Sequence, residues 1–501
     1  MPRTGFLAAI STALILTACS SMGLPSYDPD KGLVMHPSDS EGESQSSDND
    51  TSGSLTLGAL FGSSSSSAVA KTGYVVGDEP YAVRAGATIL DQGGSAADAA
   101  AATYFALAAS YPVAAGLGGG GLCVVYDAAS GRSQTIDFLA RNAARGGAFA
   151  VPGNVAGFAV LQAAYGRLPW TRDVALGESL AGAGVPISAA LAERLKASQN
   201  VVRLDAGLAA EYLDESGQVK AAGSRVVNPA LAMTLDAIRQ HGANAFYRGA
   251  VARKIAAYAA AEGGAVSEGD LAAYRAGIGA SQNVNFGNER VYLPPRSVGA
   301  GSFAAVVLSQ LVDAQGNLKL GDKSGAAARR AVSQAVAQFG VTSLPSDLGA
   351  TGFAALDTNG QAVACAVTMN GPFGSGHTSA DTGVTLATAP SSGQVGLAAA
   401  FLTPMVATED VSGPIQLPGE DASRGVALVG AGAGGPGGTA AIAYALLRVA
   451  GGEDMTKPRD LRTDLSAARA APTDTVNAIV CQSLCTALPD PAAHGAAAAG
   501  G

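Results

Sequence analysis

Histidine is the first side chain to consider in a search for catalytic or metal-binding groups, and this chain has only four. His36 precedes the globular part of the sequence, and His494 lies in a segment rich in alanine and glycine. Only His241 and His377 fall in the body, far apart and without a nearby cluster of cysteine or histidine. We therefore expect no metal site, and a Ser-His-Asp triad has few candidates.

Among the cysteines, Cys19 stands apart because it follows a segment that looks like a signal sequence. Arg3 precedes an apolar stretch at 6–16, which is too short to span a bilayer but suits a secretory signal. Leu16-Thr17-Ala18-Cys19 resembles a bacterial lipobox. We expect a signal peptide at 1–19, lipidation at Cys19, and a lipid-anchored protein of the bacterial cell envelope, on the outer membrane facing the periplasm. The alternative is an ordinary secretory signal with a chance cysteine.

The other four cysteines give two different expectations. Cys123 and Cys365 lie in the apolar runs GLCVVY and AVACAV, which predict buried, inert thiols rather than nucleophiles. Cys481 and Cys485 are close enough in sequence for a local disulfide in an oxidising periplasm, although helical geometry there would have to relax. Whether these two pair stays open.

Composition limits the classes of partner. The chain has 501 residues, of which 48% are hydrophobic and 14% charged, enough for a large globular core. Its formal net charge is −9 and no basic run is interleaved with aromatics, so nucleic acid is not an expected partner. Residues 20–70 are rich in Ser, Asp and Gly and predict a flexible tether. We therefore expect contact with the membrane through the lipid anchor.

The body must supply the elements that position any functional group. Apolar periodicity and turn signals predict helices at 81–92, 95–109 and 440–449, and strands at 122–127, 133–138, 353–357, 362–368 and 426–429. Asn359-Gly360 between two of these strands is a strong hairpin signal. Strands in two clusters with helices around them indicate a layered α+β fold.

Two glycine-rich loops, 116–121 and 430–438, require a choice between a nucleotide site and a structural role. A dinucleotide site has a strand before the glycines and a helix after them, whereas the order around 116–121 is reversed. Neither loop carries the Lys-Ser/Thr pair of a phosphate-binding loop. A nucleotide role is therefore disfavoured, and these glycines instead permit close packing and expose N–H groups that can stabilise an oxyanion.

Several motifs, in order along residues 72–450, resemble those of the gamma-glutamyltranspeptidases. In the first part they are GGSAADAA at 93–100, the glycines at 116–121, VPGNVAG at 151–157, YGRLPW at 165–170, FYRG at 246–249, the 263–274 segment and PPRS at 294–297. In the second part they are the 357–370 segment, FGSG at 373–376 and PGGT at 436–439.

This resemblance implies an αββα sandwich of the N-terminal nucleophile hydrolase type, with four layers. It divides the chain into a large-subunit-like region at 71–349, a small-subunit-like region at 350–480 and an Ala/Pro/Gly-rich tail at 481–501. Family members cut their own chain, and the freed threonine acts as nucleophile with its α-amine as base. They transfer a gamma-glutamyl group from glutathione, and no cofactor is implied.

The position matching the family's nucleophile is Ala350, which has no hydroxyl group. Thr351 could serve as the nucleophile in place of residue 350 only if the strand register slips by one residue. Such a slip would turn the side chain of Thr351 to the other face of the strand. The hairpin leaves two alternatives. A two-residue turn at Asn359-Gly360 would pair Thr351 with Thr368, whereas a three-residue turn would pair Ala350 with Thr368.

Further positions implied by the resemblance are also altered. The arginine expected to hold the substrate's α-carboxylate falls at Leu139, with Arg141 two residues away. The expected serine pair falls at Ala400 and Phe401, and the expected acidic residue near Ser391 and Ser392. Four positions do match the family site: Thr368 as a catalytic residue, and Asn370, Gly437 and Gly438 as substrate-binding or oxyanion residues.

Two hypotheses follow from these positions. The one we favour is a lipid-anchored pseudoenzyme that keeps the fold as a binding or scaffold module, with a small amide or peptide as its ligand. Its chain would stay uncut. The alternative is a self-processing amidase or gamma-glutamyl transferase that uses Thr351 as the nucleophile and Thr368 in support, on glutathione or another amide.

Overall fold

The computed structural model describes residues 26–28, 32–34, 72–319, 325–391, 393–409, 425–455, 471 and 473–501. The chain forms two units, Met1–Ser64 and Ser65–Gly501. In the first unit a short hairpin joins β1 (Ser26–Asp28) to β2 (Gly32–Val34). The predicted signal peptide, Cys19 and most of the predicted tether lie outside the described residues. In the part of the chain that is described, no helix has the length and apolar character needed to cross a membrane.

The second unit contains two large antiparallel sheets. The seven-stranded sheet has the order β10-β5-β4-β14-β13-β3-β21. Its strands, in chain order, are β3 (Gly73–Gly77), β4 (Gly120–Asp127), β5 (Arg132–Phe138), β10 (Gly277–Ala280), β13 (Ala350–Leu356), β14 (Ala362–Thr368) and β21 (Ala496–Gly500). The six-stranded sheet has the order β11-β12-β17-β18-β19-β20. Its strands are β11 (Gln282–Phe286), β12 (Glu289–Leu293), β17 (Thr403–Glu409), β18 (Val426–Ala433), β19 (Thr475–Cys481) and β20 (Cys485–Leu488).

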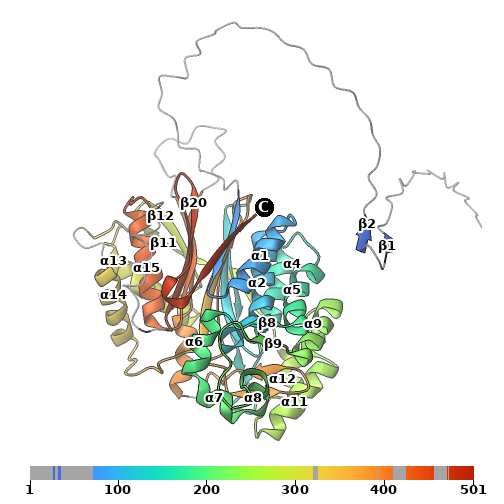
Figure 1. Ribbon diagram of the computed structural model, residues 1–501. Helices are drawn as coiled ribbons and strands as arrows, with labels where there is room; N and C mark the ends of the chain where they lie inside the picture. Colours follow the sequence, from blue (N-terminus) through green and yellow to red (C-terminus); the bar gives the residue numbers. More distant parts are fainter. Residues whose placement is uncertain are drawn as a thin grey trace, which may run out of the picture. The chain divides into compact units, whose positions relative to one another are not determined.

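The two sheets face each other, and helices cover both outer faces (Figure 1). Between the sheets, Val76, Val124 and Ala354 of the first pack with Val406 and Val429 of the second. On the outer face of the first sheet lie α1 (Pro80–Asp91) and α2 (Ala96–Ser110), and on that of the second lie α13 (Gly299–Leu311), α14 (Gly325–Gln338) and α15 (Pro436–Ala450). The predicted αββα sandwich with four layers is confirmed.

The remaining elements lie outside the two large sheets. The helices are α3 (Pro112–Ala115), α4 (Asn154–Tyr165), α5 (Trp170–Ala183), α6 (Ala189–Ala197), α7 (Gln199–Leu204), α8 (Ala206–Tyr212), α9 (Pro229–His241), α10 (Asn244–Tyr247), α11 (Ala250–Ala261), α12 (Glu268–Ala273), η2 (Gly393–Phe401) and η3 (Pro491–Ala493). Three small hairpins pair β6 (Arg141–Asn142) with β7 (Ala150–Val151), β8 (Val185–Pro186) with β9 (Arg225–Val226), and β15 (His377–Ser379) with β16 (Val384–Leu386).

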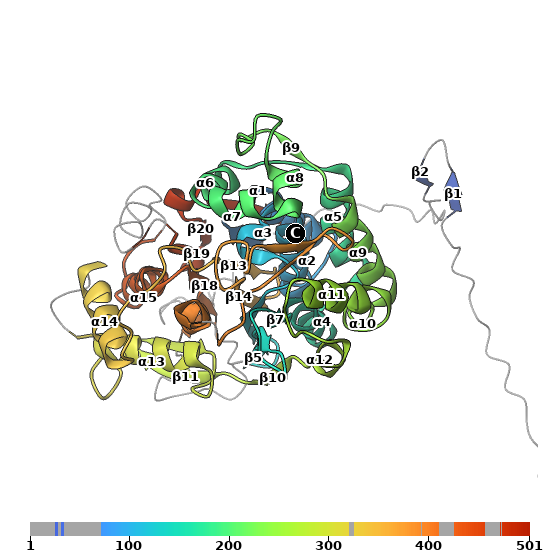
Figure 2. The same cartoon turned by 90° about the horizontal axis from the view of Figure 1, so that it is seen from below.

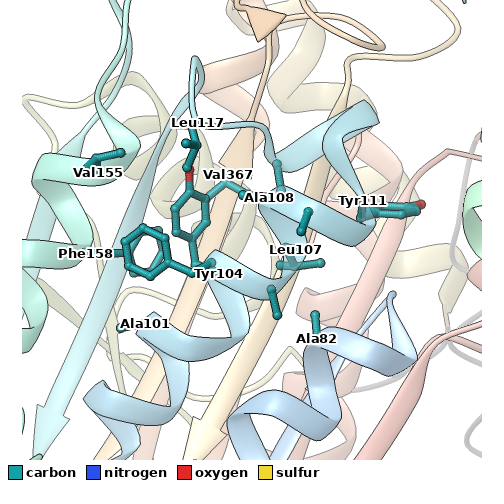
Figure 3. Close-up of a cluster of buried hydrophobic side chains, with 14 of the residues drawn as sticks. Ala82, Ala101, Tyr104, Leu107, Ala108, Tyr111, Leu117, Val155, Phe158 and Val367 are labelled. Carbon is teal, nitrogen blue, oxygen red and sulfur yellow. The ribbon is translucent and has the colours of Figure 1, made fainter. Parts of the chain in front are cut away.

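Helix α2 is the centre of the core beside the first sheet. Its start is a capping box, in which the Ser95 hydroxyl accepts from the Asp98 N–H and the Asp98 carboxylate accepts from the Ser95 N–H. Every residue of the helix is buried, which explains why its sequence is apolar all round. Tyr104 stacks on Phe158 with ring centroids 4.1 Å apart (Figure 3). Alanine at most other positions lets the neighbouring helices approach closely.

The C-terminal segment differs from the predicted tail. Residues 481–501 include β20 and β21, which lie at the edges of the two sheets. Strand β21 pairs with β3 along its whole length, from Ala496 opposite Gly77 to Gly500 opposite Gly73. Alanine and glycine have low strand propensity, so composition alone indicated a tail, whereas an unpaired sheet edge next to β3 recruits this segment as a strand.

The cysteines also correct one expectation. Cys123 and Cys365 lie opposite each other on β4 and β14 and form a disulfide, so the prediction of inert free thiols was wrong. The runs around them predicted burial correctly, but burial gives no information about which strand lies alongside. Cys481 and Cys485 also form a disulfide, across the β19–β20 hairpin. Because this segment is a hairpin, the helical spacing that made the pairing uncertain does not apply.

Candidate active site of the family and its altered residues

The register of the β13–β14 hairpin decides between the two alternatives for the nucleophile position. Ala350 lies opposite Thr368, and Thr351 lies opposite Val367. The Asp357 N–H donates to the Gln361 carbonyl at 3.0 Å, so three residues, 358–360, form the turn. The strand therefore has no one-residue slip, and the position beside Thr368 is occupied by a methyl group.

Thr351 points away from that position, because neighbouring side chains alternate between the faces of a strand. Its hydroxyl donates to the Asp78 carboxylate at 2.6 Å, and the Asn477 amide donates to the other Asp78 oxygen at 2.7 Å. Thr351 is fully buried. Burial raises the pKa of Asp78 from 3.8 to about 6, and the hydrogen bonds from Thr351 and Asn477 oppose that shift. Thr351 is thus part of a buried polar network.

Thr368 and Asn370 hold the backbone around the nucleophile position. The Thr368 hydroxyl lies 3.0 Å from the Leu348 carbonyl oxygen and 3.2 Å from that of Gly349, and it accepts from the Asn370 N–H at 2.9 Å. Asn370 has a φ of 55°, in the left-handed region, and its amide donates to the Thr388 carbonyl. Its buried Oδ1 has no partner among the described residues. Their role in binding or catalysis stays a prediction.

Gly437 and Gly438 begin α15 directly after β18, as in a loop that could present N–H groups to an oxyanion. A Cβ atom at Gly438 would lie 2.2 Å from the Ala433 carbonyl oxygen, so only glycine fits this approach. The Gly438 N–H donates to the Gly435 carbonyl at 3.1 Å. Ala433 belongs to the same buried cluster as Ala350, which brings the start of α15 to the nucleophile position.

Ala350 packs in a cluster of hydrophobic side chains. We call this set the Ala350 cluster: Leu122, Ala300, Ala350, Ala366, Leu402, Ala431 and Ala433, with Leu139 and Val298 packed against it. Leu139 stands where the resemblance predicts an arginine. A gamma-glutamyl group carries an α-carboxylate and an α-ammonium, and burying either charge without a partner is costly. The side chains of the cluster carry no charge, and the nearby buried Arg194 and Asp347 are paired with each other.

The other altered positions do not supply the missing charges. Arg141 is exposed, and its guanidinium lies over the Tyr274 ring, 5.5 Å from the centroid. Ser391 is also exposed, and its hydroxyl donates to Asn142 at 2.9 Å. Phe401 is buried against Phe303. Ser392 lies outside the described residues.

A buried ion pair next to Ala350 was not predicted. Arg194 of α6 donates to the Asp347 carboxylate at 2.6 Å, and the same oxygen accepts from the Gly349 N–H at 2.7 Å. Gly349 has a φ of 58°, and a Cβ there would lie 1.8 Å from the Gly371 carbonyl oxygen. These contacts fix the segment before Ala350, which is where a family member would be cut. Because Arg194 and Asp347 are far apart in sequence, no local pattern signals their pairing.

The described residues contain no group of three or more His, Cys, Asp or Glu side chains able to hold a metal ion. The polar groups around Ala350 are hydroxyls, amides and backbone groups, together with the Asp78 carboxylate and the Arg194–Asp347 pair. The site's potential chemistry is acyl transfer with an oxyanion site, but the nucleophile position lacks the group that would react.

Comparison with known proteins identifies the family. The family model described as "Gamma-glutamyltranspeptidase" matches residues 82–336, just over half of the chain. The chain is 31% identical over 252 residues to the "Glutathione hydrolase proenzyme" of Escherichia coli (strain K12), covering 46% of this chain and 43% of that protein. It is 33% identical over 230 residues to the "Acylase ACY 1 proenzyme" of Pseudomonas sp. (strain SE83), covering 40% and 41%.

These matches span less than half the length of the relatives, and the family model ends before Ala350. The fold itself extends further. A crystal structure of cephalosporin acylase from Bacillus halodurans superposes with a TM-score of 0.65 at 18% identity, covering 89% of this chain and 98% of that one. That likeness includes the second sheet and supports the N-terminal nucleophile hydrolase type of fold. This chain belongs to the gamma-glutamyltranspeptidase family.

Proposed function

We propose that this protein is a pseudoenzyme of its family: a chain that stays uncut, does not hydrolyse glutathione, and keeps the fold as a binding or scaffold module. The observation that carries the proposal is the pairing of Ala350 with Thr368. N-terminal nucleophile chemistry needs a hydroxyl or thiol at this position both to cut the chain and to attack the substrate. The α-amine base also exists only after that cut.

The Ala350 cluster supports the same proposal independently of the nucleophile. Leu139 stands where the resemblance places an arginine, and the buried Arg194 nearby is already paired with Asp347. Removing one charged partner of a buried, hydrogen-bonded pair costs about 2–5 kcal/mol in binding. Loss of the arginine alone would therefore weaken gamma-glutamyl binding by a factor of about 30 to several thousand.

We further propose that Cys19 carries a lipid that anchors the chain in the outer membrane, facing the periplasm. The support is the lipobox-like sequence. Metabolic labelling with a radioactive fatty acid should label the wild-type protein and leave a Cys19→Ala variant unlabelled. Equal labelling of both would reject the anchor.

The main experiment is a denaturing gel of the purified protein after long incubation, run with and without reductant. Reductant is essential because Cys123 and Cys365 lie on opposite sides of Ala350 and their disulfide would hold two fragments together. We expect one full-length band in both lanes and no release of glutamate from glutathione. Two bands under reducing conditions, or glutathione hydrolysis above a buffer blank, would overturn the proposal.

One observation favours the alternative amidase, namely the 2.6 Å hydrogen bond from Thr351 to Asp78. A carboxylate could take the proton from Thr351 as its oxygen attacks the Ala350 carbonyl carbon, and the peptide nitrogen of Thr351 would leave with a proton to give an ester. Water would then hydrolyse that ester, releasing a carboxylate at Ala350 and leaving Thr351 as a new N-terminus. In that case the smaller fragment would begin at Thr351 on N-terminal sequencing. A Thr351→Ala variant would then stay whole under conditions that cut the wild type.

A further inference from the structure

One groove of the molecule is lined by residues other than those that the resemblance assigns to catalysis or to the oxyanion. It lies between α11 on one side and α7 and α8 on the other, with β15 as its floor, and its volume is about 980 Å³. We call it the α8–α11 groove; these helices lie together in Figure 2. Neither Ala350, Thr368 nor the glycines that begin α15 line it.

One end of the groove is cationic. Arg253 and Lys254 both line it from α11, and both are exposed. The Arg253 guanidinium makes no hydrogen bond or ion pair within the part of the chain described here. The Lys254 ammonium donates to the Asp381 carbonyl at 3.4 Å, which leaves its other protons available. This end can therefore receive a carboxylate.

The other end is acidic. Glu262 directly follows α11, and its side chain is 41% exposed. Its carboxylate lies 3.8 Å from the His377 imidazole, too far for a hydrogen bond. It is therefore available to an ammonium group. Lys254 and Glu262 are eight residues apart, which corresponds to about 12 Å along a helix.

The middle of the groove combines apolar side chains with polar ones, including those of β15. Ala257 and Ala261 line it from α11, and Val201 and Leu204 face them from α7. Leu204 is 88% exposed, which is unusual for a leucine at the rim of a concave site. The Tyr258 hydroxyl makes no hydrogen bond among the described residues, and burial, followed by the charges of Asp205 and Glu262, raises its pKa to about 12. It is thus a neutral donor at the centre.

We propose that the α8–α11 groove binds a short peptide with free ends, three to five residues long, through its two termini. The C-terminal carboxylate lies at Arg253 and Lys254, the N-terminal ammonium lies at Glu262, and apolar side chains contact Leu204 and Ala257. An extended peptide spans about 3.3–3.6 Å per residue, so four residues match the distance of about 12 Å. Opposite charges at the two ends of the groove complement a zwitterionic peptide.

Other ligand classes fit the groove less well. A polyanion such as a nucleotide would meet the carboxylates of Asp205, Glu262 and Asp381, which also line it. A purely apolar ligand would leave Arg253 and Glu262 without a role. The proposal does not depend on whether the chain is cut at Ala350, because no residue of the groove takes part in that chemistry.

The test is isothermal titration of the full purified protein with the peptide Ala-Leu-Leu-Ala. We expect saturable binding at one site per chain, and about a hundredfold weaker binding of the same peptide with an acetylated N-terminus and amidated C-terminus. Lys254→Ala and Glu262→Gln should each weaken binding of the free peptide about tenfold, since each removes one charge-assisted contact. High salt should weaken it as well.

A steric pair provides the matched control. Ala257 lines the groove and Ala260, on the same helix, is exposed and does not. Ala257→Trp should abolish binding, whereas Ala260→Trp and the distant Arg132→Ala should leave it unchanged. Unaltered thermal unfolding would show that each variant is folded. No binding of the free peptide, equal binding of the blocked peptide, or binding that survives Ala257→Trp would each refute the proposal. The gel experiment described under the proposed function tests whether the chain is cut, so its result is independent of the peptide titration.

Discussion

The buried carboxyl group of Asp78 should make the stability of this protein depend on pH. Burial raises its pKa from 3.8 to about 6, and the side chain is only 1% exposed. Between these two values the folded state still holds a proton that the unfolded state has lost. The contribution of Asp78 to the free energy of unfolding is therefore fully present at pH values below its pKa in the unfolded state. It is lost as the pH rises through its pKa in the folded state.

The size of this effect follows from the two pKa values. Each pKa unit corresponds to 1.36 kcal/mol, so a shift of about two units corresponds to about 3 kcal/mol. An Asp78→Asn variant keeps the shape and still accepts one hydrogen bond, but it has no proton to lose. We expect its free energy of unfolding to equal that of the wild type near pH 4 and to exceed it by about 3 kcal/mol above pH 6.5.

Urea unfolding followed by circular dichroism, at intervals from pH 4 to 8, measures this difference. Other buried acids add their own slopes. Burial raises the pKa of Glu79 to about 8, with a smaller contribution from the Asp78 charge, so the comparison uses the difference between the two proteins below pH 6.5. Glu215→Gln, at an exposed site, serves as the control and should follow the wild type. If the Asp78→Asn and wild-type curves run parallel across pH 4 to 6.5, Asp78 does not titrate there and the reasoning is wrong.

Three more variants test the region around Ala350. Ala350→Thr places a hydroxyl opposite Thr368 and beside the Gly349 carbonyl, which already accepts a hydrogen bond. We therefore expect partial self-cleavage on a reducing gel, without hydrolysis of glutathione. An intact chain would show that the protein has lost more than its nucleophile. Cys365→Ser removes the Cys123–Cys365 disulfide, so the two fragments of a chain cut next to Ala350 should separate on a gel without reductant. Fragments that stay joined would contradict this disulfide. Arg194→Met leaves Asp347 buried without its partner and should lower the free energy of unfolding by about 3–5 kcal/mol in urea, a loss that Arg194→Met with Asp347→Leu should largely restore.

The elements of this fold are predictable where local signals are strong. Apolar runs and the Asn359-Gly360 turn predicted β13 and β14. Strand β14 has the expected bounds, 362–368, whereas β13 begins at Ala350 and ends at Leu356 instead of spanning 353–357. The register between them was not predictable, because turns of two and three residues fit the same pair. One hydrogen bond across the turn, from Asp357 to Gln361, distinguishes them in the structure.

Partners distant in sequence were beyond prediction. Cys123 and Cys365 are 242 residues apart, and each apolar run predicted burial without indicating its neighbour. Asp78 and Asn477 meet only because β3 and β19 lie in facing sheets. Strand β21 shows the same limit, since its alanines become a strand through the edge that β3 provides. In each case tertiary placement, and not local preference, determines the contact.

The changes around Ala350 form one consistent set rather than a series of separate defects. If only the arginine expected at Leu139 were missing, any polar groups left facing it would be buried without partners, at about 1–3 kcal/mol each. When both partners of a buried polar contact become apolar, the change is close to neutral. The Ala350 cluster fits this second case, since leucine and alanine fill it from both sheets. A chain that had lost only its nucleophile would still present charges to a gamma-glutamyl group. In this protein Leu139 stands where the resemblance places the arginine, so restoring the hydroxyl at position 350 should restore cutting of the chain but not turnover of glutathione.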